Sequence, residues 1–258
     1  MSLTDSQMQS MYRKGYVVVP NLVSDERVRI ILHAVNNHLG DFGMDPGQLA
    51  AYRHDSYCPD LRENPALIDL FNNGGVFETA ESLLGQGNVL PVNRFQIALR
   101  FPTRPGAALK DPPGHIDGLG TGVNGIPKGT YRRSFTALCV VLLSDLPQLD
   151  MGNFTVFPGS HRLAEAHFKQ HGHEGLHSGS LDIEGLEAAE QIMGRPGDVL
   201  FAHHMLLHCG AVNFSPFVRY AIILRFRHKG CGDFAERAFT DMWREWEGLL
   251  PGTRRSRS

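Results

Sequence analysis

The sequence predicts a mainly β fold, in which short strands form a sandwich or barrel and α-helices pack outside it. From residue 88 onward, short segments rich in β-branched and aromatic residues alternate with Gly- and Pro-rich turns. No regular alternation of strand and helix patterns follows residue 88, which counts against a doubly wound α/β fold. Helical periodicity is concentrated in the first third of the chain.

Residues 1–87 are expected to be mostly helical. Thr4 and Gln7 fit a capping box at the start of a short helix, which Gly15 ends. A Val-rich strand is expected from Tyr16 to Pro20.

Three further helices are expected before residue 88. Ser24 suits the N-cap of the first helix, and Gly40 ends it. Its apolar stripe has helical spacing and consists of Val28, Ile31, Leu32 and Val35. Asn64 and Pro65 open the second helix, with proline at the first helical position, and the third runs from Val76 to Leu84.

Residues 88–230 are expected to form the β core, and residues 231–252 a closing helix before a basic tail at 253–258. The predicted strands are Val89 to Phe101, Ser134 to Ser144, Asn153 to Phe157, Asp198 to Phe201 and Phe217 to Phe226. The closing helix would place Phe234, Ala238, Met242 and Trp246 on one face. With no internal repeat and no long linker, residues 1–258 are expected to form a single domain.

Composition excludes several classes of protein. Of 258 residues, 42% are hydrophobic and 20% charged, and the net charge of −2 argues against a general nucleic-acid-binding protein. The four cysteines form no CxxC pair, which indicates reduced thiols and, without an expected signal peptide, a cytoplasmic protein. No apolar run approaches the roughly 18 residues of a membrane span.

The pair His115 and Asp117 is the first candidate for a metal site. In an extended segment, residues two apart project from the same face, so imidazole and carboxylate would lie together. Adding His208 completes the two-His-one-carboxylate triad that suits non-haem Fe(II). The chain between Asp117 and His208 is long enough for several strands to return it beside the first two residues. We therefore expect these three residues to bind iron.

Arg219 lies within an apolar stretch that resembles a buried strand. Arginine is almost never fully buried without a partner, and its planar guanidinium suits a carboxylate. The distal carboxylate of 2-oxoglutarate would be such a partner; a structural ion pair with Asp or Glu is the alternative.

Other histidines suggest other sites. His204 and His208 have the i, i+4 spacing of a zinc-binding helix, but the preceding segment is strand-like and no HExxH glutamate follows His204. A second group of histidines lies at 167, 171, 173 and 177, where a solvated loop is the simpler interpretation.

Five ordered motifs across residues 7–226 carry a resemblance to a known family. They are the entry strand Tyr12 to Pro20, His115-x-Asp117, the Met151 to His161 segment ending in Pro-Gly-Ser-His, the Arg195 to Val199 turn, and His208-x4-Asn213-x-Ser215-x3-Arg219. On these motifs the sequence resembles the phytanoyl-CoA dioxygenase family of Fe(II)- and 2-oxoglutarate-dependent oxygenases.

The resemblance implies a double-stranded β-helix, the cupin-like jelly roll, with iron held by His115, Asp117 and His208. It implies that Arg219, helped by Ser215, holds 2-oxoglutarate, which O₂ converts to succinate and CO₂ as substrate is oxidised. Approximate alignment adds two weaker cosubstrate candidates, Thr136 and Gln96, for which ordinary strand packing is the alternative. Because related halogenases carry Gly or Ala in place of this aspartate, Asp117 favours hydroxylation or another oxidation that is not halogenation.

The substrate is expected to be a small molecule, and basic residues near the metal-site pair favour an anion. Those residues are Arg100, Arg104, Lys110, Lys128, Arg132 and Arg133. Tyr131, Arg132 and Arg133 are the candidate substrate-binding residues; solvated loop residues are the alternative. Desaturation, epoxidation and cyclisation share the same cofactor chemistry, and a catalytically silent binding protein or a zinc hydrolase is a further alternative. The sequence leaves the oligomeric state open.

Overall fold

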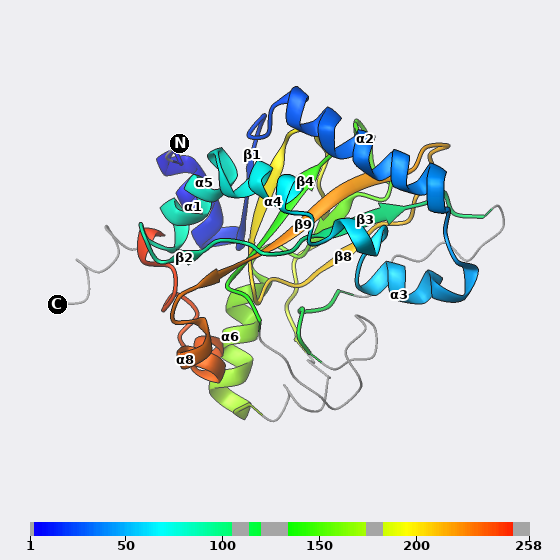
Figure 1. Ribbon diagram of the computed structural model, residues 1–258. Coiled ribbons are helices and arrows are strands. Elements are labelled where there is room, and N and C mark those ends of the chain that lie inside the picture. The colour runs from blue at the N-terminus through cyan, green and yellow to red at the C-terminus, as the bar shows by residue number, and fades with distance from the viewer. Residues whose placement is uncertain (1–2, 105–113, 120–133, 174–182, 250–258) are drawn as a thin grey trace.

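The computed structural model describes residues 3–104, 114–119, 134–173 and 183–249, and two antiparallel sheets lie at its centre (Figure 1). The larger sheet has six strands in the order β1-β7-β4-β9-β2, with β3 also paired to β9, and the smaller has the order β6-β5-β8. The larger sheet contains β1 (Tyr16–Val19), β2 (Val89–Leu90), β3 (Gln96–Arg100), β4 (Ala137–Leu142), β7 (Val199–His203) and β9 (Arg219–His228). The smaller sheet contains β5 (Phe154–Val156), β6 (Glu190–Gln191) and β8 (His208–Gly210).

Helices cover the outer face of the larger sheet (Figure 1). These helices are α1 (Asp5–Lys14), α2 (Asp25–Phe42), α4 (Pro65–Asn72) and α5 (Gly75–Leu84). Helix α3 (Leu49–His54), between 3₁₀ turns at Pro46–Gln48 and Pro59–Leu61, has no buried residue. Of the later elements, α6 (Ser160–His171) and the 3₁₀ turn Ala235–Phe239 pack in a separate cluster, and α8 (Cys231–Phe234) and the 3₁₀ turn Glu247–Leu249 complete the described chain.

Strand β4 shows how the pleat divides the core. Its alternate residues Ala137, Cys139 and Val141 face the helices and pack in one cluster with α2 and α5. The intervening residues Leu138 and Val140 face the smaller sheet and pack in a second cluster with Phe154 and Val156 of β5. Alternate residues of β9, among them Ala221 and Ile223, also point into the space between the sheets, where the second cluster lies.

The N-terminal helices begin where the sequence predicts. Thr4 and Gln7 form the capping box of α1, Ser24 caps α2, and Asn64 caps α4 with proline in its first turn. Helix α2, however, continues through Gly40 and ends at Gly43, which adopts a φ of 66°. A glycine inside a helix costs only about 1 kcal/mol, and the packing of the apolar stripe offsets it.

The prediction of a mainly β protein is corrected by the structure, which is mixed, with 38% helix and 22% strand. The largest departure within the expected strand region is α6, whose buried residues Ser160, His161, Ala164 and Phe168 follow helical spacing. Two of these four residues are polar, so the apolar periodicity of the segment is weak in the sequence.

The strand expected from Val89 to Phe101 is two strands, because Pro91 has no N–H to donate and interrupts the pairing. Both parts still pair with β9. Two short strands, β6 and β8, were not predicted as strands; at two and three residues they have little periodicity to recognise.

The expected closing helix over 231–252 is wrong: the segment consists of α8 and short 3₁₀ turns, and residues 250–252 lie outside the described part. Phe239 ends the first 3₁₀ turn, whereas the buried residues Met242 and Glu245 lie in turns between it and the second one. Trp246 is fully buried and stacks on His203 with the ring centroids 5.0 Å apart. These tertiary contacts override the helical pattern.

Among the described residues, no helix combines the length and apolar character that crossing a membrane would require.

Candidate functional site

His115 and His208 are held together by their backbones at one end of the smaller sheet. Each residue's N–H donates to the carbonyl of the other at an N–O distance of 3.0 Å, although they are far apart in the sequence. His208 begins β8, and Gly114, just before His115, lies where an added Cβ would be 2.6 Å from the ring of Phe157. A close approach of the two chain segments therefore requires glycine at this position.

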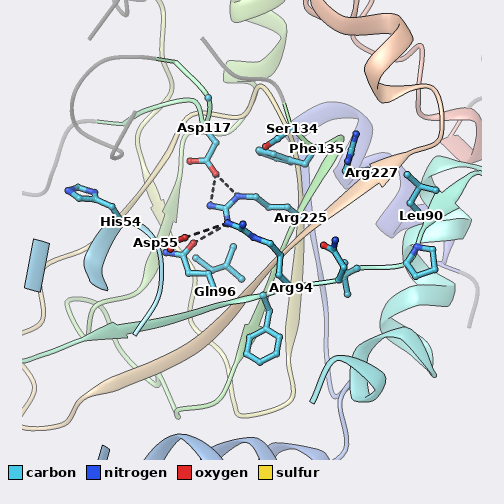
Figure 2. A pocket seen from close by; sticks show the side chains of 16 residues that line it. His54, Asp55, Leu90, Arg94, Gln96, Asp117, Ser134, Phe135, Arg225 and Arg227 are labelled. Atoms are coloured by element: carbon cyan, nitrogen blue, oxygen red, sulfur yellow. Dashed lines mark hydrogen bonds and ion pairs between the residues drawn. The ribbon is translucent and has the colours of Figure 1, made fainter. Parts of the chain in front are cut away.

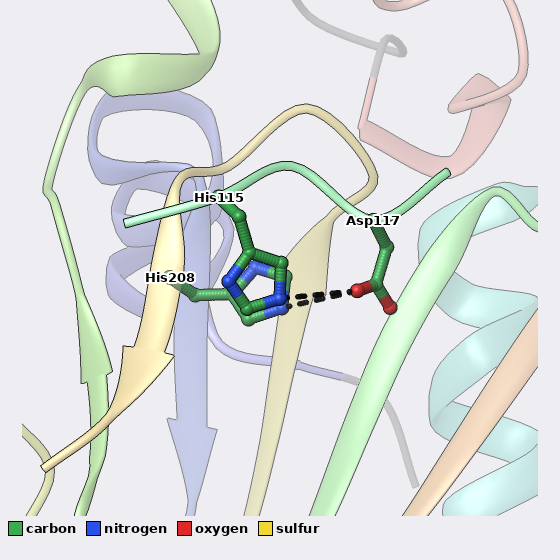
Figure 3. Close-up of side chains that lie close together, drawn as sticks. All are labelled: His115, Asp117 and His208. Atoms are coloured by element: carbon green, nitrogen blue, oxygen red, sulfur yellow. Dashed lines mark ion pairs between the residues drawn. The ribbon is translucent and has the colours of Figure 1, made fainter. Parts of the chain in front are cut away.

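The side chains of His115, Asp117 and His208 converge on one point (Figure 3). Their three potential ligand atoms all lie within 4.8 Å of one another. Oδ1 of Asp117 is 3.4 Å from Nε2 of His115 and 3.6 Å from Nε2 of His208. Two imidazole nitrogens and one carboxylate oxygen form the donor set that suits non-haem Fe(II) with open coordination positions.

The ring of His208 is oriented by its surroundings. Its Nδ1 lies 2.9 Å from the carbonyl oxygen of Leu206, so Nδ1 carries the proton and donates it. This hydrogen bond leaves Nε2, the nitrogen that faces Asp117, unprotonated and able to bind a metal. Phe154 stacks on the other side of the ring with centroids 5.2 Å apart, which restricts rotation.

The electrostatics keep the aspartate charged and its neighbour neutral. Burial alone would raise the pKa of Asp117, but the positive charge of Arg225, together with the neighbouring rings of His115 and His208, holds that pKa well below its usual range. Burial lowers the pKa of His115, and this effect exceeds the opposing hydrogen bond to Asp117. A charged carboxylate beside a neutral imidazole is the protonation state that metal binding needs.

Arg219 is buried in β9 and directly opposes Arg100 of β3. Its Nε donates to the carbonyl of Gly152 at 2.8 Å and its Nη1 to that of Ala98 at 3.0 Å. Among the described residues, no carboxylate lies within ion-pairing distance of it, so the structural ion pair considered as an alternative is not found there. Burial, together with the charge of Arg100, lowers the pKa of Arg219 to about 9.

Two adjoining cavities open at the site. The smaller, of about 300 Å³, is lined by all three residues of the metal-site triad, by Arg219 and by Arg100. The larger, of about 410 Å³, includes Arg94 and Arg227 in its wall (Figure 2). The residues common to both walls are His54, Gln96, Asp117, Ile223 and Arg225.

The remaining expected cosubstrate residues are placed differently. Gln96 lines both cavities, and its Oε1 accepts a hydrogen bond from Arg225 at 3.1 Å. Thr136 lines neither: its hydroxyl donates to Glu245 at 2.5 Å. Ser215 also lines neither, because its hydroxyl donates to Asn213 within the turn before β9. Thr136 and Ser215 are therefore not among the residues that line the two cavities.

The candidate substrate residues Tyr131, Arg132 and Arg133 lie outside the described residues, as do Lys110, Lys128 and His177. The zinc interpretation is not supported, because His204 packs against Phe239 and His203 and is not part of the one metal-site group found among the described residues.

Arg225 was missed in the sequence, although the signal was present. It stands in the apolar stretch Ile222 to Phe226 and lies six residues after Arg219. An even separation along a strand places both arginines on the same face. Arg227, two residues further, continues this row along the wall of the larger cavity.

Comparison with known proteins agrees with this geometry. The family model for phytanoyl-CoA dioxygenase (PhyH) matches residues 11–221. No curated protein sequence matches the chain.

Among solved structures, the non-haem α-ketoglutarate-dependent carbocyclase SnoK from nogalamycin biosynthesis is similar, with a TM-score of 0.61, 22% identity and coverage of 87% of this chain and 83% of that one. HygX from Streptomyces hygroscopicus, with nickel and 2-oxoglutarate bound, has a TM-score of 0.58, 16% identity and coverage of 88% of each chain. EctD from S. alaskensis has a TM-score of 0.55, 20% identity and coverage of 88% and 77%. These structures share the fold with this chain.

Proposed function

This chain belongs to the phytanoyl-CoA dioxygenase family of Fe(II)- and 2-oxoglutarate-dependent oxygenases, and from that premise we propose that it hydroxylates a small anionic molecule. One observation carries the proposal: the smaller cavity is lined by the His115–Asp117–His208 triad and by the buried Arg219, which has no carboxylate partner among the described residues.

The three residues of the triad would hold iron through Nε2 of each histidine and a carboxylate oxygen of Asp117. Bound Fe(II) with 2-oxoglutarate supplies the activation of O₂, with oxidative decarboxylation of the cosubstrate to succinate and CO₂. The protein's own contribution is to keep Asp117 charged, to fix the proton of His208 on Nδ1 and to leave metal positions open toward the smaller cavity.

Arg219 would bind the distal carboxylate of 2-oxoglutarate. A buried guanidinium is costly unless an anion offsets its charge, and Arg219 faces the like charge of Arg100 directly across the strand pair. Both arginines line the cavity that also contains the metal ligands, so one dicarboxylate can reach both. Arg100 contributes a second positive charge to the same carboxylate, while its Nη2 donates to the carbonyl of Gly210 at 2.6 Å.

The larger cavity would take the substrate, because it adjoins the metal site through Asp117 and Arg225. Its wall carries three arginines but only two carboxylates, and Asp117 is assigned to the metal. The other carboxylate, Asp55, pairs with both Arg62 and Arg94 and so is shared. Arg227 is exposed and has no acidic partner within 4 Å among the described residues. This excess of positive charge favours a carboxylate, phosphate or sulfate on the substrate.

A screen of small anions and their neutral analogues tests the proposal. The purified protein with Fe(II), 2-oxoglutarate and O₂ should release succinate in proportion to substrate oxidised, and the product should gain one oxygen atom. A product that has lost two hydrogens would instead indicate desaturation or ring formation by the same cofactors. Binding of a small molecule without any succinate would favour the silent binding protein, and turnover without O₂ would favour a hydrolase.

A further inference from the structure

We propose that Arg225 is a positioning residue for the metal site: it holds one oxygen of Asp117 so that only the other oxygen is presented to the metal. The inference deepens the proposed function and rests on the iron site described above. It concerns the direction of the Asp117 carboxylate, which the backbone of that residue does not fix.

The two oxygens of Asp117 have different surroundings (Figures 2 and 3). Oδ1 faces the two histidines, at 3.4 Å and 3.6 Å from their Nε2 atoms. Oδ2 accepts hydrogen bonds from Arg225, at 2.9 Å from Nη2 and 3.2 Å from Nε. The guanidinium thus binds Oδ2, the carboxylate oxygen that points away from the two histidines.

Arg225 is itself held in place. Its remaining terminal nitrogen, Nη1, donates to Oε1 of Gln96 at 3.1 Å, and its guanidinium carbon lies 5.8 Å from the ring centre of Phe135. All three guanidinium nitrogens therefore have acceptors. This assigns Gln96 a role in supporting Arg225.

The backbone around Arg225 is paired in a sheet, whereas that around Asp117 is not. Arg225 lies in β9, an interior strand of the larger sheet, and directly opposes Leu138 of β4. Asp117 lies in a turn after an isolated bridge, next to Gly118 with its φ of 93°. A side chain on a turn has more freedom than one on a paired strand, so the strand residue is the one that sets the geometry.

The consequence is a constraint on how Asp117 binds a metal. A carboxylate with both oxygens available can coordinate a cation through one or both of them. With Oδ2 held by Arg225, Asp117 would offer only Oδ1 to the metal and would leave the ion's other positions to the cosubstrate and O₂. Without Arg225, Asp117 could turn away or take an additional position.

Metal affinity, measured without cosubstrate or turnover, separates this role from a general loss of activity. We would titrate Co(II) into the metal-free wild type and into Arg225→Met, which keeps a stem of similar length but has no donors and no charge. Replacing partners that orient metal ligands typically costs about 10–100-fold in metal affinity, and we expect a loss in that range. Arg227→Met, on the same face of the same strand but without contact to Asp117, should bind Co(II) as the wild type does.

The sign of the effect distinguishes the mechanisms. A guanidinium that acted only as a nearby positive charge would repel the metal, so Arg225→Met would then bind Co(II) more tightly; tighter or unchanged binding overturns the proposal. Arg225→Lys should recover part of the affinity, because it restores the charge and one donor. If Arg225→Met does not fold, Gln96→Leu provides the test: removing the acceptor for Nη1 should weaken Co(II) binding more than Arg227→Met does, and equal binding overturns the proposal. Because no step requires 2-oxoglutarate, failure of the proposed reaction would leave this result unchanged.

Discussion

Replacing Arg219 should raise the concentration of 2-oxoglutarate that turnover requires, and the structure sets the size of the effect. Arg219 uses Nε and Nη1 for the carbonyls of Gly152 and Ala98, and its Nη2 has no hydrogen-bond partner among the described residues. A hydrogen bond from this charged group to the cosubstrate would contribute roughly 1.5–3 kcal/mol. That range corresponds to roughly a 10- to 150-fold weaker affinity once the interaction is removed.

The assay is succinate release as a function of 2-oxoglutarate concentration, with Fe(II) saturating. Arg219→Met should show the full shift. Arg219→Lys should show a smaller one, because an ammonium keeps the charge without the planar fork. Arg27→Lys is a matched control, since Arg27 also donates to two backbone carbonyls, those of Leu70 and Asn73, but lies outside both cavities.

The same variants give a second, independent readout. 2-Oxoglutarate should raise the thermal stability of the metal-loaded wild type, since a ligand that binds only the folded state stabilises it. That stabilisation should be much smaller in Arg219→Met at the same concentration. A folded Arg219→Met protein with an unchanged 2-oxoglutarate titration would refute the assignment of Arg219.

Three further predictions follow from named contacts. His208→Ala should lose metal binding and turnover, whereas His204→Ala should retain both. Co(II) titration of the two variants checks the metal binding. If His204→Ala lost Co(II) binding and His208→Ala kept it, the ligand assignment would be wrong. Arg227→Gln should lower kcat/KM for an anionic substrate at low ionic strength. The effect should be smaller at physiological salt, because the Debye length falls from roughly 30 to 8 Å. A loss of kcat/KM that does not depend on salt would exclude electrostatic steering of the substrate by Arg227. Burial lowers the pKa of His161 from 6.5 to about 4, so between these pH values the folded state binds fewer protons than the unfolded state. The free energy of unfolding should therefore fall by about 3 kcal/mol as the pH falls from 6.5 through 4. Denaturant titrations should show that the free energy of unfolding depends less on pH in His161→Phe than in the wild type. The same pH dependence in both proteins would contradict a buried, neutral His161.

The metal site was accessible from the sequence because it depends on short-range spacing and on residue type. His115 and Asp117 are two residues apart, and only a few residue types supply iron ligands. Arg219 stood out as a cation within an apolar strand. Arg225 carries the same signal, but its meaning depends on Asp117, which lies more than a hundred residues earlier in the chain, and no local pattern shows that contact.

The departures from the predicted fold have tertiary causes. The segment after β9 has the apolar spacing of a helix, yet Trp246 packs on His203 and Glu245 accepts the hydroxyl of Thr136, so the backbone follows these contacts. Thr136 was expected to line the site with its strand, and Leu138, two residues later, does line the smaller cavity. Thr136 itself precedes the first residue of β4, and its hydroxyl donates to Glu245 of the closing segment. The position of that distant segment was the information that the sequence lacked.

The most direct test of the account is succinate formation by the wild type and by His208→Ala, each checked for folding and incubated with Fe(II), 2-oxoglutarate, O₂ and the small-anion panel. The account predicts that the wild type forms succinate only when metal, cosubstrate and O₂ are all present, and that His208→Ala forms none above the protein-free background. Equal succinate from both proteins, or none from a metal-loaded wild type across the panel, would contradict it.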